Sequence, residues 1–340
     1  MQLHTVDEDP GTAWIKDDCA AIEAPPDPEV EGTPELAPEA QWSVGSKRTG
    51  VCGAVSPNVI QLSDGGYRMY YAQMLPREGF PAGANDYDNC TTRILSAYSE
   101  DTWTWTPEPG IRVGAREGGA GAFRVVSPEV VPLPDHSGRL RMYFECSPDP
   151  RSGPSTIRSA ISEDGGLQWV VENGARIGAS NGSFNAPRLL YLEDKRCRLY
   201  FGQRSAGIMS AISTDGLNFE REPGTRIERG NTHDVVNAFA PEVLRLRSGG
   251  YRMYYSGYSA NSRAQVLSAF SEDGLQWEKD TEPAIAPGGR WDAAKASEMC
   301  LTVLPSAKDE GAVYRMFYEA CDGTAPDKRG VWRVVGASAA

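Results

Sequence analysis

The chain has 340 residues, 40% of them hydrophobic and 24% charged, and its formal net charge is -12. This charge argues against a nucleic-acid partner, because binding to a phosphate backbone requires clustered lysine and arginine. The sequence holds no apolar run near the roughly 20 residues that span a bilayer, and its first residues lack the basic and apolar regions of a signal peptide. We therefore expect a cytoplasmic protein without a membrane partner. Seven cysteines without a Cys-x-x-Cys pair predict neither a disulfide framework nor a zinc site.

A pattern of short strand-like runs recurs along the chain. In its clearest copy, at 240–277, an Ala-Pro-Glu-Val opening is followed by a Gly-Gly turn, the run Tyr-Arg-Met-Tyr-Tyr and the run Val-Leu-Ser-Ala-Phe. The copies begin near positions 56, 127, 186, 240 and 296, and the fourth run of a copy begins at Trp103, Trp169, Phe219 or Trp277. Short runs rich in aromatic and β-branched residues, with Gly and Asp at the turns, are typical of propeller blades. The sequence therefore predicts an all-β fold, a single five-bladed β-propeller domain.

The fifth copy ends one strand short, and the missing strand is expected at the other terminus. Residues 8–17 match 272–280 with one insertion, and each segment continues to an Ala-Ile pair. We therefore predict that the N-terminal segment, residues 8–22, completes the last blade and leaves fewer bare sheet edges. The alternative is a disordered tail, which the polar composition of this segment would allow.

The connections between strands indicate which face of the propeller carries the site. Loops between second and third strands, and between blades, are longer and more varied than the first hairpins, so we expect the site on their face. The Pro- and Glu-rich segment 25–40 is either a solvated connector or a lid.

Two repeated features are expected to be architectural. Residues 162–169 fit Ser-x-Asp-x-Gly-x-x-Trp, the Asp-box of sialidase-like propellers, and shorter versions stand at 213–219 and 271–277. An Asp in such a turn accepts backbone N–H bonds while the aromatic residue packs between blades. The second strands carry an arginine each, for which we expect salt links between blades; these are Arg68, Arg141, Arg252 and Arg315.

The Pro-x-Val openings and the Tyr-x-Met-Tyr-Tyr strands resemble those of glycoside hydrolase families 43 and 32, the arabinanase, xylosidase and invertase superfamily. The resemblance covers nearly the whole chain: the opening at 127–130 is similar to that group's Pro-Asp-Val, and 289–292 to its Trp-Asp approach to a blade. It implies a five-bladed propeller that hydrolyses carbohydrate. Hydrolytic carboxylates of that superfamily usually stand just before the proline. The matching positions here are not acidic; they are Ser56, Ser127, Ala186 and Phe239.

A different ring of polar residues follows the prolines. Positions related by rotation face the axis together, so we expect these residues to be neighbours. They are Asn58, Glu129, Arg188, Glu242 and, by alignment, Glu298. Carboxylates in one funnel repel each other, which raises the pKa of at least one and yields an acid beside a base. We therefore consider the three glutamates as catalytic candidates. The alternative is that they bond to the arginine and to backbone amides and hold the axis together.

Further candidates come from the loops and strand ends on the same face. His233, one of three histidines, lies beside Asp234 and is either a proton shuttle or structural. The predicted substrate-binding residues are Asn58, Arg188, Asp234, Asp292, Trp291, Glu145, Glu319, Gln73, Gln203, Asn185 and Arg124. The run Asn85–Asn89 offers oxygen ligands for Ca²⁺ but lacks EF-hand spacing, so a plain polar loop is the alternative. We expect no other cofactor.

The sequence thus predicts a glycosidase-like enzyme that acts on a carbohydrate or another polyhydroxylated small molecule by carboxylate acid–base chemistry. Two alternatives remain open. One is a non-hydrolytic biosynthetic enzyme of the lyase or cyclase type, which the loss of acidic residues before the prolines favours. The other is a sugar-binding propeller without chemistry.

Overall fold

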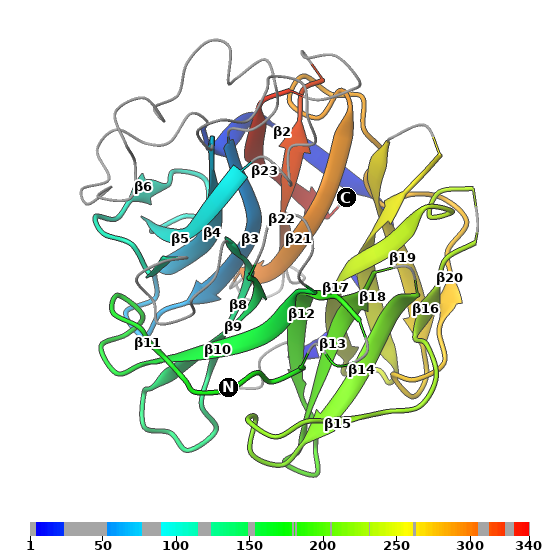
Figure 1. Cartoon of the computed structure of the whole chain (residues 1–340). Helices are drawn as coiled ribbons and strands as arrows, with labels where there is room; N and C mark the ends of the chain where they lie inside the picture. The colour runs from blue at the N-terminus through cyan, green and yellow to red at the C-terminus, as the bar shows by residue number, and fades with distance from the viewer. Residues whose placement is uncertain are drawn as a thin grey trace.

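The computed structural model describes residues 5–23, 53–76, 90–114, 124–148, 154–178, 180, 182–204, 206–230, 232–260, 263–304, 313–323 and 330–339. The described residues form 23 strands and no helix, so the all-β prediction is confirmed (Figure 1). Accordingly, no helix in these ranges is long and apolar enough to cross a membrane.

The strands pair in five antiparallel groups, which we call units 1 to 5. Unit 1 contains β3 (Gly53–Gln61), β4 (Tyr67–Pro76), β5 (Cys90–Ser99), β6 (Thr106–Pro107) and β7 (Val113–Gly114). Unit 2 contains β8 (Arg124–Pro132), β9 (Leu140–Ser147), β10 (Thr156–Ser162) and β11 (Val170–Val171). Unit 3 contains β12 (Phe184–Tyr191), β13 (Cys197–Gln203), β14 (Gly207–Ser213), β15 (Glu220–Arg221) and β16 (Ile227–Glu228).

Unit 4 contains β17 (Asn237–Leu246), β18 (Tyr251–Tyr258), β19 (Ala264–Ser271) and β20 (Glu278–Lys279). Unit 5 contains β21 (Lys295–Leu304), β22 (Val313–Cys321) and β23 (Trp332–Ala339), and its last strand pairs antiparallel with β2 (Trp14–Ile22). The short strand β1 (Thr5–Val6) pairs in parallel with β17.

The two chain ends meet in unit 5, beside unit 1. Strand β2 lies next to β23, with Trp14 opposite Ala339 (Figure 1). At its other end β23 pairs in parallel with β3, where Trp332 is the partner of Gly53. A Cβ at Gly53 would lie 2.2 Å from the carbonyl oxygen of Trp332, and φ at this residue is 142°, so only glycine fits this approach. The sheets of units 5 and 1 therefore join directly.

Aromatic pairs connect each unit to the next. A ring from a second strand contacts, edge to face, the aromatic residue that follows the turn of the neighbouring unit. The pairs are Tyr70–Trp169, Tyr143–Phe219, Tyr200–Trp277, Tyr254–Trp14 and Phe317–Trp105, with centroids 5.4 to 6.2 Å apart. The prediction that Trp103 begins a fourth strand is wrong. Trp103 is 50% exposed, and β6 begins at Thr106, after Trp105.

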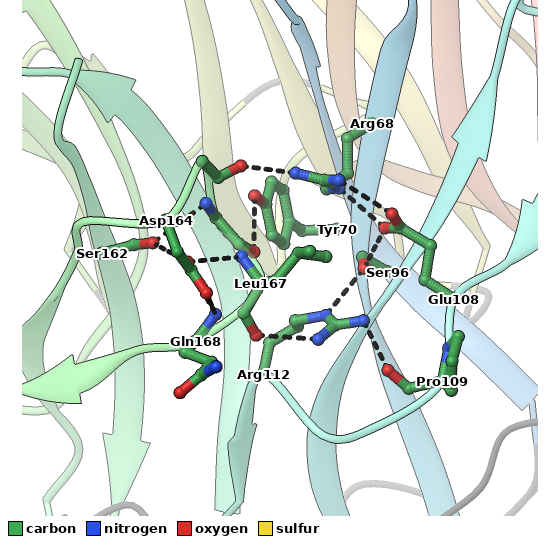
Figure 2. Close-up of polar contacts among 12 residues, drawn as sticks. Arg68, Tyr70, Ser96, Glu108, Pro109, Arg112, Ser162, Asp164, Leu167 and Gln168 are labelled. Carbon is green, nitrogen blue, oxygen red and sulfur yellow. Dashed lines mark hydrogen bonds and ion pairs between the residues drawn. The ribbon is translucent and has the colours of Figure 1, made fainter.

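The Asp-box turn of unit 2 makes the contacts expected of an architectural element (Figure 2). Ser162 Oγ donates to Asp164 at 2.8 Å, and the same carboxylate accepts the N–H groups of Leu167 and Gln168 at 3.1 and 3.0 Å. The indole of Trp169 donates to the carbonyl of Gly166 at 2.9 Å. The turn is thus held by its own side chains, and its aromatic residue packs on Tyr70 of unit 1.

The second-strand arginines of units 1 and 2 form ion pairs within their own unit, whereas Arg252 of unit 4 also binds Asp9, in the N-terminal segment that leads to β2, as the predicted links between blades require. Arg68 binds both carboxylate oxygens of Glu108 at 2.7 and 2.8 Å, and it reaches unit 2 through the carbonyl of Gly165 (Figure 2). Arg141 pairs in the same way with Glu172 of its own unit. The expected salt links between blades are therefore wrong for these two arginines, because a carbonyl oxygen is the partner across the boundary.

A register shift marks the first strand of every unit. In units 1 to 4 the shifted residue precedes the proline and has a φ of 44° to 54°; these residues are Ser56, Ser127, Ala186 and Ala240. In unit 5 the shift falls at Glu298. Cys300 lies opposite Phe317 in unit 5, and Glu129 lies opposite Tyr143 in unit 2, so Cys300 is the counterpart of Glu129. Glu298 is thus the counterpart of Ser127, not of Glu129 as the sequence alignment had it. The alignment slipped because unit 5 has Met299 where the other units have proline.

Candidate active site

The residues that follow the prolines meet in a buried group, which we call the Arg188 cluster: Asn58, Glu129, Arg188 and Glu242. Asn58 Nδ2 donates to Glu129 Oε2 at 2.7 Å, and Arg188 Nε donates to Glu242 Oε2 at 2.9 Å. Arg188 Nε also lies 3.8 Å from Glu129 Oε2. The guanidinium donates further to the carbonyl oxygens of Pro57, Pro128, Pro187 and Met299. One side chain therefore bonds to the first strands of all five units.

The carboxylates of this cluster also bind backbone amides of neighbouring units. Glu129 Oε1 accepts the N–H of Leu189 at 3.0 Å, and Glu242 Oε1 accepts that of Leu301 at 3.3 Å. Glu129 is 0% exposed and Glu242 1%. A carboxylate that is buried and bonded in this way holds strands together, so the contacts support the structural interpretation of these two glutamates.

One cation faces two carboxylates in the Arg188 cluster. Burial raises the pKa of Glu129 to about 8, against the lowering effect of Arg188, and the charge of Glu242 adds to the increase. Burial also raises the pKa of Glu242, which Arg188 opposes. With Glu129 protonated the cluster is neutral, which removes the cost of an unpaired buried charge.

A second acidic group lies at the register shift of unit 5; we call Glu298 and Glu319 the carboxylate pair. Glu298, which is partly exposed, accepts a hydrogen bond from Ser127 Oγ at 2.8 Å, and its own N–H donates to Ser256 Oγ at 2.8 Å. Its backbone is therefore tied to unit 4 and its carboxylate to unit 2.

Glu319 stands on β22, opposite Ser297. Its two oxygens accept Ser297 Oγ at 2.6 Å and the N–H of Ser56 at 3.1 Å. Burial raises the pKa of Glu319 well above its ordinary value, the neighbouring charge of Glu298 raises it further, and Lys295 opposes the increase. The pair thus combines a carboxyl that holds its proton with a partly exposed carboxyl beside it, as general acid–base chemistry requires.

Several predicted residues stand at the ends of second strands near this group. Glu145 faces Val126 in unit 2 as Glu319 faces Ser297 in unit 5, and it is buried. Gln73 and Gln203 stand one residue beyond the position that Glu145 holds in unit 2, and they lie opposite Ala54 and Phe184. The remaining predicted members are Arg124, which is buried on β8, and Asn185, which is half-buried on β12.

Sequence reasoning missed Arg93, Ser256, Ser297 and Lys295. The buried Arg93 donates from Nε to Gln73 Oε1 at 2.6 Å. The Nζ of Lys295 lies 5.7 Å from the ring of Tyr258 and 5.3 Å from that of Trp332. The one available signal was that Lys295 and Ser297 stand at alternate positions of a strand-like run just before Glu298, which places the two on one face of the strand.

His233 lies at the same end of unit 4. Its Nδ1 is 2.6 Å from Gln265 Nε2, and its carbonyl oxygen would lie 2.9 Å from a Cβ at Gly257, the neighbour of Ser256. Asp234 is fully buried and holds its loop in place: it accepts Gly230 N–H at 3.2 Å, Tyr255 Oη at 3.1 Å and Lys279 Nζ at 2.5 Å.

Asp292 repeats this arrangement in unit 5. It accepts Gly289 N–H at 2.6 Å, Tyr318 Oη at 3.0 Å and Lys16 Nζ at 2.6 Å, so Lys16 of β2 is the counterpart of Lys279. Trp291 donates to the carbonyl of Asp18 at 3.2 Å. For Asp234, Asp292 and Trp291 these contacts favour a structural role over the predicted contact with substrate.

In the described part of the chain, no group of three or more His, Cys, Asp and Glu side chains is arranged to hold a metal ion. Asn85–Asn89, the calcium candidate, lies outside the described residues.

The fold is similar to that of solved structures of β-propeller glycoside hydrolases, as the resemblance of the repeats predicts. Among similar solved structures is a thermostable family-43 glycoside hydrolase, with a TM-score of 0.64 and 18% identity over 85% of this chain and 89% of that one. Another is an α-L-arabinofuranosidase from Podospora anserina in complex with cellotriose, with a TM-score of 0.62 and 10% identity over 96% and 97% of the two chains.

A third is a family 117 glycoside hydrolase from the marine bacterium Zobellia galactanivorans, with a TM-score of 0.59 and 17% identity over 88% of this chain and 86% of that one. At such identities the likeness concerns the fold, not the reaction. No protein-family model and no curated protein matches the sequence.

Proposed function

We propose that the chain is a single five-bladed propeller, closed by β2, that hydrolyses a glycosidic bond with the carboxylate pair. The five groups of antiparallel strands support the blade number. The pairing of β2 with β23, the contact of β23 with β3 and the succession of aromatic pairs support the closure. In such a ring the register shifts of all first strands gather at one end of the axis.

The observation that carries the proposal is the difference between Glu298 and Glu319. Glu319 is buried with a raised pKa and donates its proton to the leaving oxygen of the sugar. Glu298, partly exposed and oriented by Ser127, acts on the other side of the bond as base or nucleophile. Two carboxyls that flank the scissile bond are what glycoside hydrolysis needs.

The absence of acidic residues before the prolines does not weaken this assignment. By strand register the positions are Ser56, Ser127, Ala186 and Ala240, and the fifth position is Glu298. One carboxylate therefore stands where the resemblance to glycoside hydrolases expects an acidic residue, in the unit that lacks the proline. This favours hydrolysis over the lyase or cyclase alternative.

The experiment is a screen of the wild-type chain against aryl glycosides and oligosaccharides of neutral and acidic sugars, run in ¹⁸O-labelled water. We expect release of one sugar with ¹⁸O in the product, and loss of release in Glu319→Gln and Glu298→Gln. The exposed Glu220→Gln on β15 is the matched control and keeps full activity. Release without ¹⁸O would indicate elimination, and binding without release, unchanged in both variants, would indicate a sugar-binding module.

A further inference from the structure

Lys295 is a buried lysine that lies between two aromatic rings beside the carboxylate pair. It is 7% exposed, and its Nζ is 5.7 Å from the ring of Tyr258 on β18 and 5.3 Å from that of Trp332 on β23. Lysine is seldom buried to this extent. An ammonium group within about 6 Å of an aromatic ring is attracted to it, and more strongly where water is excluded. Rings from units 4 and 5 thus hold the charge of Lys295 in place.

The strand register places Lys295 diagonally from Glu319. Ser297 lies directly opposite Glu319 of β22, and Lys295, two residues earlier on β21, lies opposite Cys321. Residues at alternate positions share a face of the sheet, and diagonal neighbours in an antiparallel pair are about 7 to 8 Å apart, within reach of a long side chain. Trp332 lies in the same row, on the other side of Cys321. Lys295 and Glu319 therefore stand in adjacent rows of one face.

The groups of other residues that bond to or pair with Glu319 in the described part of the chain are uncharged. The hydroxyl of Ser297 and the N–H of Ser56 bind its two oxygens at 2.6 and 3.1 Å. On β23 the residue opposite Glu319 is Val334. Arg333, the residue before it, belongs to the other face of the sheet, because strand positions alternate.

Glu319 lies under the influence of one negative and one positive side chain. Burial raises its pKa, Glu298 raises it further, and Lys295 opposes the increase. In the proposed reaction the glycosidic C–O bond breaks with its electron pair on the leaving oxygen, and this oxygen takes the proton of Glu319. Glu298, or a water molecule that it activates, bonds to the sugar carbon. Glu319 is left as a buried carboxylate, which is costly unless a cation lies nearby.

We infer that Lys295 is a positioning residue whose charge, held between Tyr258 and Trp332, stabilises Glu319 in the ionised form that remains after proton transfer. This inference rests on the proposed function and assigns a role to a side chain that acts through Glu319 without touching the sugar. The alternative is that Lys295 only ties units 4 and 5 together through the two rings. That role predicts a loss of stability without any change in the pH dependence of activity.

The test is the pH profile of kcat and kcat/KM for Lys295→Met on the glycoside that the wild type cleaves best, with thermal unfolding and ¹³C NMR titration of Glu319. Methionine keeps a long apolar side chain between the rings and removes the charge. We expect kcat to fall about 10-fold. The alkaline limb of kcat/KM should move to higher pH, because Glu319 holds its proton more tightly without the cation. Lys295→Arg, which keeps the charge, should keep the limb near its wild-type position.

Lys279→Met is the matched control, because Lys279 also lies over a ring. Its Nζ is 6.0 Å from the ring of Tyr255 and 2.5 Å from the buried Asp234. The variant should lower Tm, since Asp234 loses its cation, and leave the alkaline limb where the wild type has it. Lys295→Gln is a second uncharged variant, in which we expect the same shift of the limb as in Lys295→Met.

A folded, active Lys295→Met or Lys295→Gln with the alkaline limb and the Glu319 titration of the wild type would overturn the inference and leave the proposed function standing. A wild-type chain that cleaves no carbohydrate would instead contradict the proposed function, and the role of Lys295 with it.

Discussion

The Arg188 cluster and the carboxylate pair both contain buried glutamates with a raised pKa, yet they differ in their charged partners and in the exposure of Glu298. In the cluster Glu129 and Glu242 are sealed from solvent and share one cation. In the pair Glu298 is partly exposed, and both glutamates accept hydrogen bonds from serine residues. The comparison teaches that position relative to the register shift, and not acidity, separates a structural glutamate from a candidate catalytic one.

The register shift explains the separation. An extra residue in a strand turns the side chains around it to new directions and leaves one residue unpaired. Glu298 is the unpaired residue of unit 5. Glu129 and Glu242 stand two residues after the shifted residue of their own units, where the strands pack together. A difference of one or two residues in the position of a glutamate relative to the register shift therefore decides whether its carboxylate lies in the core or in the site.

The largest effect that separates the two regions is expected from Arg188→Met. This change leaves Glu242 without its cation in a sealed environment and should lower the free energy of unfolding by about 3 to 5 kcal/mol, as measured by chemical denaturation. The control is Arg196→Met, which removes an exposed pair with Asp194 and should cost less than about 1 kcal/mol. Equal losses in both variants would show that the cluster is not a structural centre.

The closure of the ring is tested by Trp14→Ala. Trp14 contacts Tyr254 of unit 4 with ring centroids 5.6 Å apart and is only partly exposed, so the loss should be about 2 kcal/mol. Ile15→Ala, at a neighbouring residue that is 64% exposed, should change stability by less than about 0.5 kcal/mol. An unaltered unfolding midpoint in the Trp14 variant would mean that β2 does not close the fold.

A smaller effect concerns the pKa of Glu319, which ¹³C NMR of labelled carboxyl groups measures directly. Because Glu298 raises this pKa, Glu298→Gln should lower it, and the pH at which Glu319 loses its proton should fall. Glu220→Gln should leave the titration as in the wild type. A Glu319 carboxyl that titrates in its ordinary range in the wild type would contradict the assignment as general acid.

A further effect, spread over several pH units, is the pH dependence of stability. Folded Glu129 keeps its proton up to about pH 8, whereas the unfolded chain releases it near the ordinary value. Between these pH values the folded state binds the extra proton, so the free energy of unfolding falls as pH rises, by up to about 1.4 kcal/mol per pH unit. Glu129→Gln should flatten this slope in denaturation curves from pH 5 to 9; an unchanged slope would show that Glu129 is ionised throughout.

Much of the fold follows from local sequence, because turn glycines, aromatic residues and strand-like runs repeat in each unit. The match between residues 8–17 and 272–280 predicts that Lys16 and Lys279 have equivalent partners, and both bind a buried aspartate. The candidate site is predicted less well by the sequence. Without a proline in unit 5 nothing in the sequence fixes the register at Glu298, and burial, which separates Glu129 from Glu298, depends on strands that are far apart in the chain.

The most direct test of the two roles is a side-by-side measurement of kcat/KM for Glu319→Gln and Glu129→Gln on the carbohydrate that the wild type cleaves best, with thermal unfolding of each variant. We predict that Glu319→Gln lowers kcat/KM by at least about 100-fold with little change in Tm, whereas Glu129→Gln stays within a few-fold of the wild type. Abolished turnover in a folded Glu129→Gln, together with an active Glu319→Gln, would contradict the division between the two regions.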